Sequence, residues 1–310
     1  MTSPPSRKPA SPPPRPSSAP PPLVSSRWLI SALLLSLAAA AVCGYGALCL
    51  LFYQGQWQLL FHPSHTVSAT PANAGLPWLD IRFDVTDTGR PRLDGWWIPV
   101  VAPGTPHSQP APPGALWASD TILYLHDARG SLSDCLPALV TLHALGINVF
   151  AFDYQGFGHS AGRHPTERLA TADAIAAWTW LTDIRHIPAK NIVVFGDGVG
   201  ATFAAHLATR FAPAGVILQD PNPPARQILE ADARARLVPL SLLQTEFLDP
   251  SGDLSSIHAP LLFLDRAGNA SRTRALFNAA PYPKQIYDLR AAPDSTLTAT
   301  LRRFLDEVLR

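Results

Sequence analysis

Five aspartates stand at the ends of strand-like runs or directly after them, where acidic side chains can do chemistry. They are Asp127, Asp153, Asp197, Asp220 and Asp265. Because ligands of an open α/β sheet bind beyond the carboxyl ends of its strands, these carboxylates would face one rim. Oxygen-rich clusters of this kind bind hard cations such as Ca²⁺ or Mg²⁺. The alternative, which we favour, is that Asp153 and Asp220 brace loops and the other three are solvated, so we predict no metal and no cofactor.

A serine nucleophile with a histidine base is the second chemistry to consider. Ser160 follows Gly158 and His159 beyond the fourth strand-like run, and His126 and His159 are candidate bases. Loop hydroxyls commonly hydrogen-bond to local backbone, and we favour that role for Ser160. Cys135 is expected near the start of a helix, where a thiolate would be favoured, but we expect a packed and unreactive thiol.

The elements that would position these residues alternate along the chain from about residue 60. The later strand-like runs are continuously apolar, which is typical of strands covered on both faces. This alternation predicts an α/β fold, with a mainly parallel eight-stranded sheet and helices on both faces. A Pro-rich surface insertion is expected over residues 101–119, between the second and third strands. The predicted strands are 80–86, 94–100, 121–126, 147–153, 191–196, 214–219, 259–265 and 284–289, and the predicted helices are 133–144, 166–185, 200–211, 271–279 and 295–309.

Composition narrows the function classes. The 310 residues are 47% hydrophobic and 15% charged, which excludes a chain that is disordered overall. The formal net charge of +1 gives no case for nucleic-acid binding. Three cysteines exclude a disulfide framework and a Cys-rich zinc site.

The N-terminal residues divide into a tail and a candidate anchor. Residues 1–27 hold ten prolines, four cations and no acid, which predicts a disordered cytoplasmic tail. Residues 28–53 carry no charge and are long enough to span a bilayer as one helix. Because no Lys or Arg follows until Arg82, the positive-inside rule predicts an exported domain over residues 54–310, on the periplasmic side of a bacterial cell. The alternatives are a cleaved signal peptide and a lipoprotein site at Cys43.

Several segments carry a resemblance to a known family. The most specific is FDYQGFGHSAGRHPTERLATADAIAAW over 152–178, where the family has D-Y-R-G-Y-G-x-S-x-G followed by a D-A-x-x-A helix. On this basis the chain resembles the α/β-hydrolase superfamily, in particular its small, membrane-anchored, serine-aminopeptidase-like branch. The resemblance covers about residues 56–310 and implies the α/β-hydrolase fold. The other matching segments are LLFHPSH (59–65), DGWWIP (94–99), YLHDARGSLSD (124–134), VVFGDGVGATFAAHLA (193–208) and APLLFLDRAGN (259–269).

The resemblance implies a nucleophile elbow that lacks its nucleophile. In the superfamily a serine stands at the centre of G-x-S-x-G, on a sharp turn between a strand and a helix. Here the elbow glycines are Gly196, Gly198 and Gly200, and the central Gly198 has no side chain. The oxyanion-binding N–H groups would belong to Val199 and Ala128.

The resemblance also implies that the acid and the base of the triad are missing. Asn269 stands at the acid position and Pro293 at the histidine position, and the chain has no histidine after His258. Asp127 replaces a glycine of the oxyanion loop, which puts a negative charge where an oxyanion would form.

Two functions follow as expectations. The first is a membrane-anchored, catalytically inactive hydrolase-fold protein that binds a lipid-like or acyl ligand or another envelope protein. The alternative is an active serine-type ester or amide hydrolase with non-standard catalytic residues. Covalent labelling by a fluorophosphonate probe discriminates between them.

Overall fold

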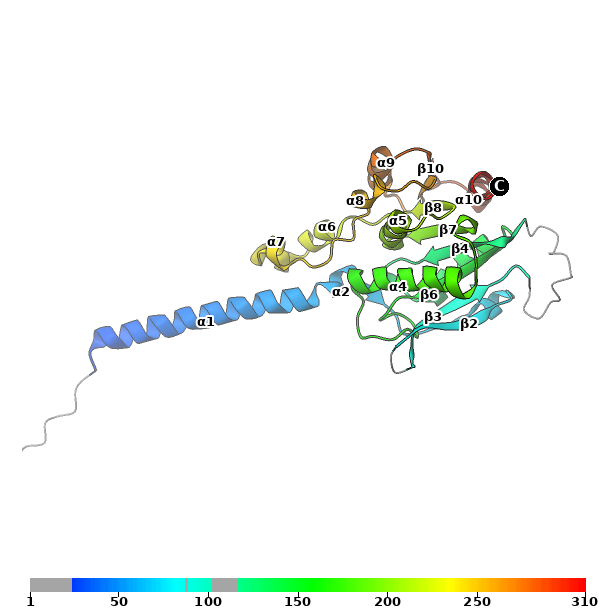
Figure 1. Cartoon of the computed structure of the whole chain (residues 1–310). Helices are drawn as coiled ribbons and strands as arrows, with labels where there is room; N and C mark the ends of the chain where they lie inside the picture. Colours follow the sequence, from blue (N-terminus) through cyan, green and yellow to red (C-terminus); the bar gives the residue numbers. More distant parts are fainter. Residues whose placement is uncertain (1–23, 87–88, 102–115) are drawn as a thin grey trace, which may run out of the picture. The chain divides into compact units, whose positions relative to one another are not determined.

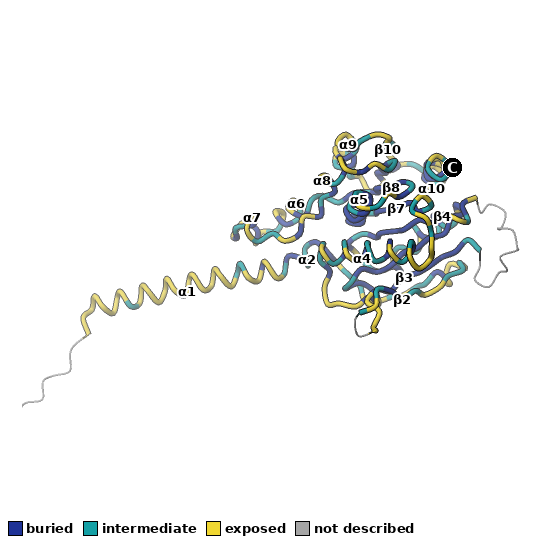
Figure 2. Tube along the Cα trace, in the orientation of Figure 1, coloured by how far each residue is buried: buried dark blue, intermediate teal, exposed yellow. Residues whose placement is uncertain are grey.

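The computed structural model describes residues 24–86, 89–101 and 116–310, and the chain divides into two compact units, residues 1–48 and residues 49–310. The described part of the first unit consists mainly of helix α1 (Ser26–Gly55), whose only charged residue is Arg27. Most of its residues are exposed (Figure 2). This helix contains the predicted span 28–53, and it is long and apolar enough to cross a bilayer. Most of the predicted tail, residues 1–27, lies outside the described residues.

An eight-stranded sheet forms the centre of the second unit (Figure 1), which confirms the predicted α/β class and strand number. The strand order is β10-β9-β8-β7-β4-β6-β3-β2, and the strands from β10 to β6 run parallel to their neighbours. β2 and β3 are each antiparallel to their neighbours. The strands are β2 (Leu79–Val85), β3 (Pro91–Ile98), β4 (Trp117–Leu125), β6 (Ile147–Asp153), β7 (Ile192–Asp197), β8 (Gly215–Gln219), β9 (Leu261–Asp265) and β10 (Lys284–Asp288).

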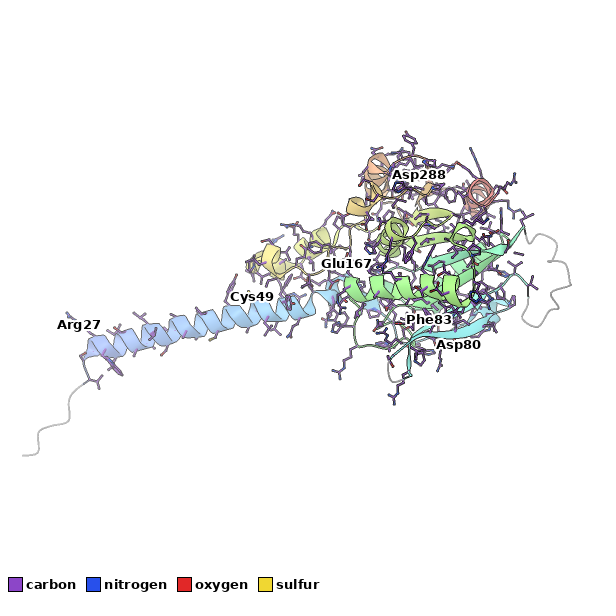
Figure 3. The ribbon with its side chains drawn as sticks, viewed as in Figure 1. Arg27, Cys49, Asp80, Phe83, Glu167 and Asp288 are labelled. Carbon is purple, nitrogen blue, oxygen red and sulfur yellow. The ribbon has the colours of Figure 1, made fainter. Side chains whose placement is uncertain are left out.

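Alternating side chains of β6 show that both faces of the sheet are covered. Val149 and Ala151 belong to a core cluster with leucines of α3 and α10. Phe150 and Phe152 point to the opposite face, where both contact Phe83 of β2 (Figure 3). Because every residue of β6 is buried, its sequence is apolar almost throughout rather than alternating.

Helices of normal length follow the strands as the sequence predicts. The predicted helix 166–185 is an α-helix that continues as one π-helical turn, Trp180–Ile184. The helices are α3 (Leu132–His143), α4 (Glu167–Thr179), α5 (Gly200–Arg210), α9 (Ala270–Ala279) and α10 (Asp294–Val308).

Three features differ from the sequence-based expectation. β4 begins at Trp117, inside the predicted insertion 101–119, and its pairing with β6 shifts register before Thr121. The rest of that insertion, residues 102–115, lies outside the described residues. A two-stranded parallel pair and several short helices were not predicted, because segments of two to six residues show no apolar period. They are β1 (His62–Pro63), β5 (Arg129–Gly130), α2 (Trp57–Leu60), η1 (Pro71–Ala74), η3 (Ala189–Asn191), α6 (Ala225–Glu230), η4 (Ala233–Leu237), α7 (Leu240–Leu243) and α8 (Ser251–Leu254).

Candidate functional site

The turn between β7 and α5 contains the three glycines of the predicted elbow. Gly198 adopts a φ of +56°, a left-handed conformation that costs glycine little and other residues more. A Cβ on Gly196 would lie 2.4 Å from the carbonyl oxygen of Gly200. A Cβ on Gly200 would lie 2.0 Å from the carbonyl oxygen of Leu125. These close approaches of backbone to backbone explain why glycines hold the sharp turn in place.

The carboxylate of Asp127 lies against this turn. Its Oδ1 accepts hydrogen bonds of 2.9 Å from the backbone N–H of Val199 and of 2.9 Å from the side-chain amide of Asn222. A Cβ built on Gly198 would lie 2.0 Å from the same oxygen. Asp127 therefore occupies the space into which a side chain at position 198 would point, and it uses the N–H group that follows that position.

The residues at the predicted acid, histidine and second oxyanion positions do not contact the elbow glycines through any hydrogen bond that the described residues form. Asn269 precedes α9, where its carbonyl oxygen accepts the N–H of Thr273 at 2.9 Å. Pro293 is exposed and precedes α10. Ala128 is buried, and its carbonyl oxygen accepts the N–H of His62 next to the β1–β5 pair.

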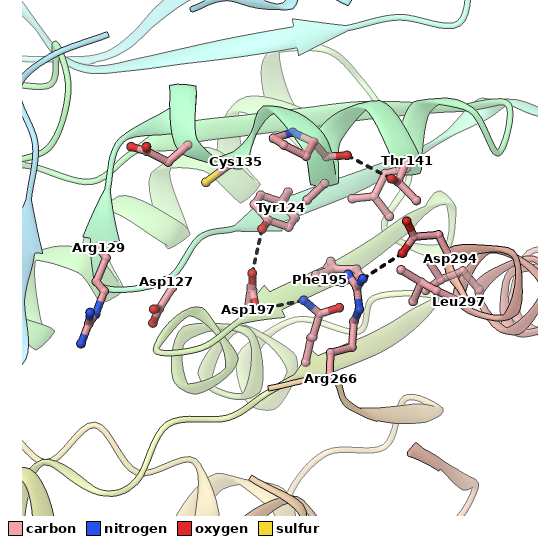
Figure 4. Close-up of a pocket in the computed structure, with 16 residues that line it drawn as sticks. Tyr124, Asp127, Arg129, Cys135, Thr141, Phe195, Asp197, Arg266, Asp294 and Leu297 are labelled. Atoms are coloured by element: carbon pink, nitrogen blue, oxygen red, sulfur yellow. Dashed lines mark hydrogen bonds and ion pairs between the residues drawn. The ribbon is translucent and has the colours of Figure 1, made fainter. Parts of the chain in front are cut away.

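A buried polar network lies beside the elbow, around Asp197 (Figure 4). The hydroxyl of Tyr124 donates to Asp197 Oδ2 at 3.0 Å, and the amide of Gln219 donates to Oδ1 at 3.1 Å. Burial is the main cause that raises the pKa of Asp197 to about 6. Because both carboxylate oxygens have donors, Asp197 is held in one orientation.

A cavity of about 380 Å³ opens next to this network (Figure 4). Its wall combines apolar side chains of the sheet, of α3 and of α10 with several carboxyl groups and two arginines. Arg266 forms a 3.0 Å ion pair with Asp294 at this wall. The lining residues are Tyr124, Asp127, Arg129, Asp134, Cys135, Pro137, Ala138, Thr141, Leu142, Phe195, Asp197, Gln219, Arg266, Asp294, Leu297 and Leu301.

The predicted alternative nucleophile, Ser160, is engaged with backbone groups. Its hydroxyl donates to the carbonyl oxygen of Asp153 at 2.5 Å and accepts the N–H of Asp94 at 2.9 Å. It therefore links β3 to the loop after β6, as favoured from the sequence. Ser160 does not line the cavity.

The histidines proposed as bases have no hydroxyl to activate. His126 is fully buried, and burial lowers the pKa of its imidazole to about 4. Its Nδ1 lies 2.6 Å from the carbonyl oxygen of Asp127, and its Nε2 lies 3.7 Å from Asp153 Oδ1. His159 is exposed. Within the described ranges, no histidine nitrogen hydrogen-bonds to a side-chain hydroxyl.

The strand-end aspartates do not form a metal-binding cluster. In the described part of the chain, no three His, Cys, Asp or Glu side chains are placed to hold one ion. Asp153 and Asp220 brace loops, since they accept the N–H groups of Leu132 and of Arg266. The expectation that the other three are solvated is wrong for two of them. Asp265 is buried and accepts the N–H of Gly268 at 3.0 Å, and both carboxylate oxygens of Asp197 accept hydrogen bonds from protein side chains.

Cys135 lies in the first turn of α3 and lines the cavity. Burial raises the pKa of its thiol well above the usual value, so the neutral thiol predominates. This agrees with the expected unreactive thiol. Nothing in the sequence points to Asn222 and Gln219, because their partners Asp127 and Asp197 are 95 and 22 positions away along the chain.

Three comparisons place these observations among known proteins. A family model described as an alpha/beta hydrolase fold matches residues 133–238. An uncharacterized protein of Mycobacterium tuberculosis is 29% identical over 285 residues, which cover 87% of this chain and 94% of that protein. Human alpha/beta hydrolase domain-containing protein 17B is 33% identical over 105 residues, which cover 34% of this chain and 36% of that protein.

Solved structures show the same architecture at low sequence identity. An esterase of Pyrococcus furiosus superposes with a TM-score of 0.58 at 18% identity. The aligned region covers 81% of this chain and 98% of the esterase chain. A puromycin-hydrolyzing peptidase of Mycobacterium tuberculosis superposes with a TM-score of 0.52 at 17% identity and covers 76% of this chain and 39% of its own. At these identities the likeness concerns the fold alone.

Proposed function

The chain belongs to the α/β-hydrolase superfamily, and from this premise we propose that it is a membrane-anchored member that binds a ligand or a protein without catalysing hydrolysis. Membership alone does not decide activity, because function resides in the site rather than in the fold. The proposal therefore rests on the chemistry available at the elbow.

The contact between Asp127 and Val199 is the observation that carries the proposal. Acyl transfer in this fold needs a hydroxyl at the elbow and an N–H group free to bind the developing oxyanion. Here Gly198 has no hydroxyl, and Asp127 Oδ1 already accepts the N–H of Val199 at 2.9 Å. A carboxylate in this position repels an oxyanion as well as blocking it. Loss of the nucleophile alone typically costs about 10⁶-fold in kcat.

The positions of the base and the acid support the same proposal. Asn269 and Pro293, proposed as the equivalents of the acid and the histidine, offer neither a carboxylate nor an imidazole. His126 is neutral at physiological pH, since burial lowers its pKa to about 4, and its imidazole hydrogen-bonds to no hydroxyl among the described residues. The hydroxyl of Ser160 is used by the backbone. Among the residues that the structure describes, no specific contact favours the alternative of an active serine hydrolase.

Fluorophosphonate labelling tests catalytic silence directly. The full chain, purified in detergent, is expected to take up no probe at any serine when adducts are mapped by mass spectrometry. An active serine hydrolase processed in parallel controls for probe quality, and a Ser160→Ala variant identifies signal from the one serine weighed as a nucleophile. Labelling of a single serine that disappears on heat denaturation would overturn the proposal.

We further propose that α1 anchors the protein, with its N-terminus in the cytoplasm and residues 54–310 exported. The length and the apolar sequence of α1 support the anchor, and the cations before it support the orientation. The protein should stay in the membrane fraction after alkaline carbonate washing. A C-terminal reporter that is fluorescent only in the cytoplasm should stay dark. Release by carbonate would contradict the anchor, and a fluorescent reporter would contradict the orientation.

We propose that the cavity beside Asp197 holds the apolar part of a lipid-like or acyl ligand. Its volume of about 380 Å³ suits a small ligand, and Phe195, Leu297 and Leu301 give it an apolar wall. Native mass spectrometry of the full chain with added fatty acids should show one bound molecule. Ala138→Trp, which fills the cavity, should abolish it, whereas Gly252→Ala on a remote helix should not. Binding that persists in the Ala138→Trp variant would exclude the cavity, and a partner protein would become the remaining binding target.

A further inference from the structure

The segment between β8 and β9 exposes large apolar side chains although it is well packed. It contains α6, η4 and α7 and continues to Phe247. Leu237, Leu242 and Phe247 are 61%, 81% and 61% exposed. Val238 and Leu240 are buried between them. The exposed side chains therefore stand on a segment whose other side is part of the fold. We call Leu237, Leu242 and Phe247 the apolar triplet.

Two hydrogen bonds hold this segment to the residue that directly follows α1. The amide of Gln56 donates to the carbonyl oxygen of Leu243 at 3.0 Å, and its Oε1 accepts the N–H of Thr245 at 3.1 Å. Gln56 is buried, so these bonds are shielded from water. Because α1 ends at Gly55, the segment is fixed beside the point at which the chain leaves that helix.

A second pair of bonds fixes the end of the segment on α4. The N–H of Phe247 donates to a carboxylate oxygen of Glu167 at 2.6 Å, and the N–H of Glu167 donates to a carboxylate oxygen of Glu246 at 2.5 Å. Glu167 is the first residue of α4 (Figure 3). The carbonyl oxygen of Phe247 also accepts the N–H of Ala225 at 2.8 Å, so the backbone of Phe247 is fixed while the residue remains exposed.

We propose that the apolar triplet inserts into the interfacial region of the bilayer that α1 spans, so that the domain rests on the membrane. This inference depends on the proposed anchor. Interfacial segments bury apolar side chains about 5–10 Å into the boundary between headgroups and acyl chains. Gln56, the first residue after the anchor helix, is hydrogen-bonded to this segment, so the bilayer is the apolar phase within reach of the segment. Arg236 lies in η4 directly before Leu237, is exposed, has no acidic partner among the described residues, and suits a lipid phosphate.

Photo-crosslinking from lipid acyl chains tests the contact in the full chain. The protein is reconstituted into phosphatidylcholine vesicles that carry a diazirine in one acyl chain, irradiated and digested. Lipid adducts are expected in peptides of α1 and in the tryptic peptide 237–266, which contains the apolar triplet. Substitution of all three residues by serine should lower the adducts in peptide 237–266 by about fivefold or more and leave those in α1 unchanged.

Ile184→Ser is the matched control, because Ile184 is 66% exposed on the π-helical turn after α4 and should not touch lipid. That variant should keep the wild-type pattern of adducts. Adducts in α1 with none in peptide 237–266, or a triple-serine variant labelled like the wild type, would overturn this inference and leave the anchor intact. A chain without adducts in α1 would overturn the anchor and this inference with it.

Discussion

Substitution of Gly198 by serine is the most direct perturbation of the elbow. A serine Cβ would lie 2.0 Å from Asp127 Oδ1 and 2.8 Å from Asp127 Cβ, so the carboxylate must move away. Its movement breaks the bonds to Val199 and Asn222, which costs about 2 kcal/mol. The left-handed φ of +56° adds about 1 kcal/mol for a residue with a Cβ. The expected loss in the free energy of unfolding is therefore about 3 kcal/mol, with no gain of esterase activity.

A double-mutant cycle separates the two costs. Asp127→Ala alone should lower the free energy of unfolding by about 2 kcal/mol. In that background Gly198→Ser should lower it by only about 1 kcal/mol more, which is the backbone cost. The control is Gly75→Ser, since Gly75 has a φ of +71° and open space around its Cβ, so that only the backbone cost applies. The assay is denaturant unfolding of the full chain in detergent, followed by tryptophan fluorescence. Equal costs of Gly198→Ser in both backgrounds would refute the steric role of Asp127, and esterase activity in the serine variant would refute the absence of a base.

Three further predictions follow from the described geometry. Burial raises the pKa of Asp153 to about 8 from an unfolded value near 4, so its stabilising effect is complete below pH 4 and is lost as the pH rises towards 8. Between pH 6.5 and 8, Asp153 should lower the free energy of unfolding by about 1.5 kcal/mol. His126 offsets about 0.4 kcal/mol of this, because it loses its remaining proton in the unfolded chain over the same range while it is already neutral in the folded chain; Asp153→Asn should remove the net fall. Cys135, with its raised thiol pKa, should react with N-ethylmaleimide at pH 8 more than about tenfold slower than in the guanidinium-unfolded chain, as measured by peptide mapping; equal rates would contradict its burial. Gly200→Ala pushes a Cβ to 2.0 Å from a main-chain oxygen of β4 and should lower stability by about 3 kcal/mol or more, whereas Gly252→Ala, in open space, should not lower it.

The sequence predicted the sheet well for a specific physical reason. Strands buried on both faces, such as β6 and β7, are continuously apolar, and their predicted bounds differ from the observed ones by one residue or less. The short helices between β8 and β9 were missed because four to six residues do not complete an amphipathic pattern. β4 was predicted too short because its first residues were assigned to the Pro-rich insertion.

The sequence predicts which catalytic side chains are missing from the site better than it predicts which residues contact one another there. The lack of a side chain at position 198 and the unusual Asp127 can be read from the chain itself. The sequence does not show that Asp127 accepts the N–H of Val199, because that contact joins residues 72 positions apart and depends on one side-chain rotamer. The partnership with Asn222 gave no signal at all. Asp265 was expected in water because a carboxylate at a strand end is usually solvated, whereas here the turn to Gly268 encloses it.

The exclusion between the carboxylate at position 127 and any side chain at position 198 restricts how this protein can change through point mutations. A codon change that adds a hydroxyl at 198 meets Asp127, and one that removes Asp127 first leaves the N–H of Val199 without its acceptor. Either single mutation lowers stability, so a nucleophilic elbow can be regained without passing through a destabilised intermediate only if both mutations arise together. Asp127 and Gly198 therefore each restrict which substitutions the other position tolerates.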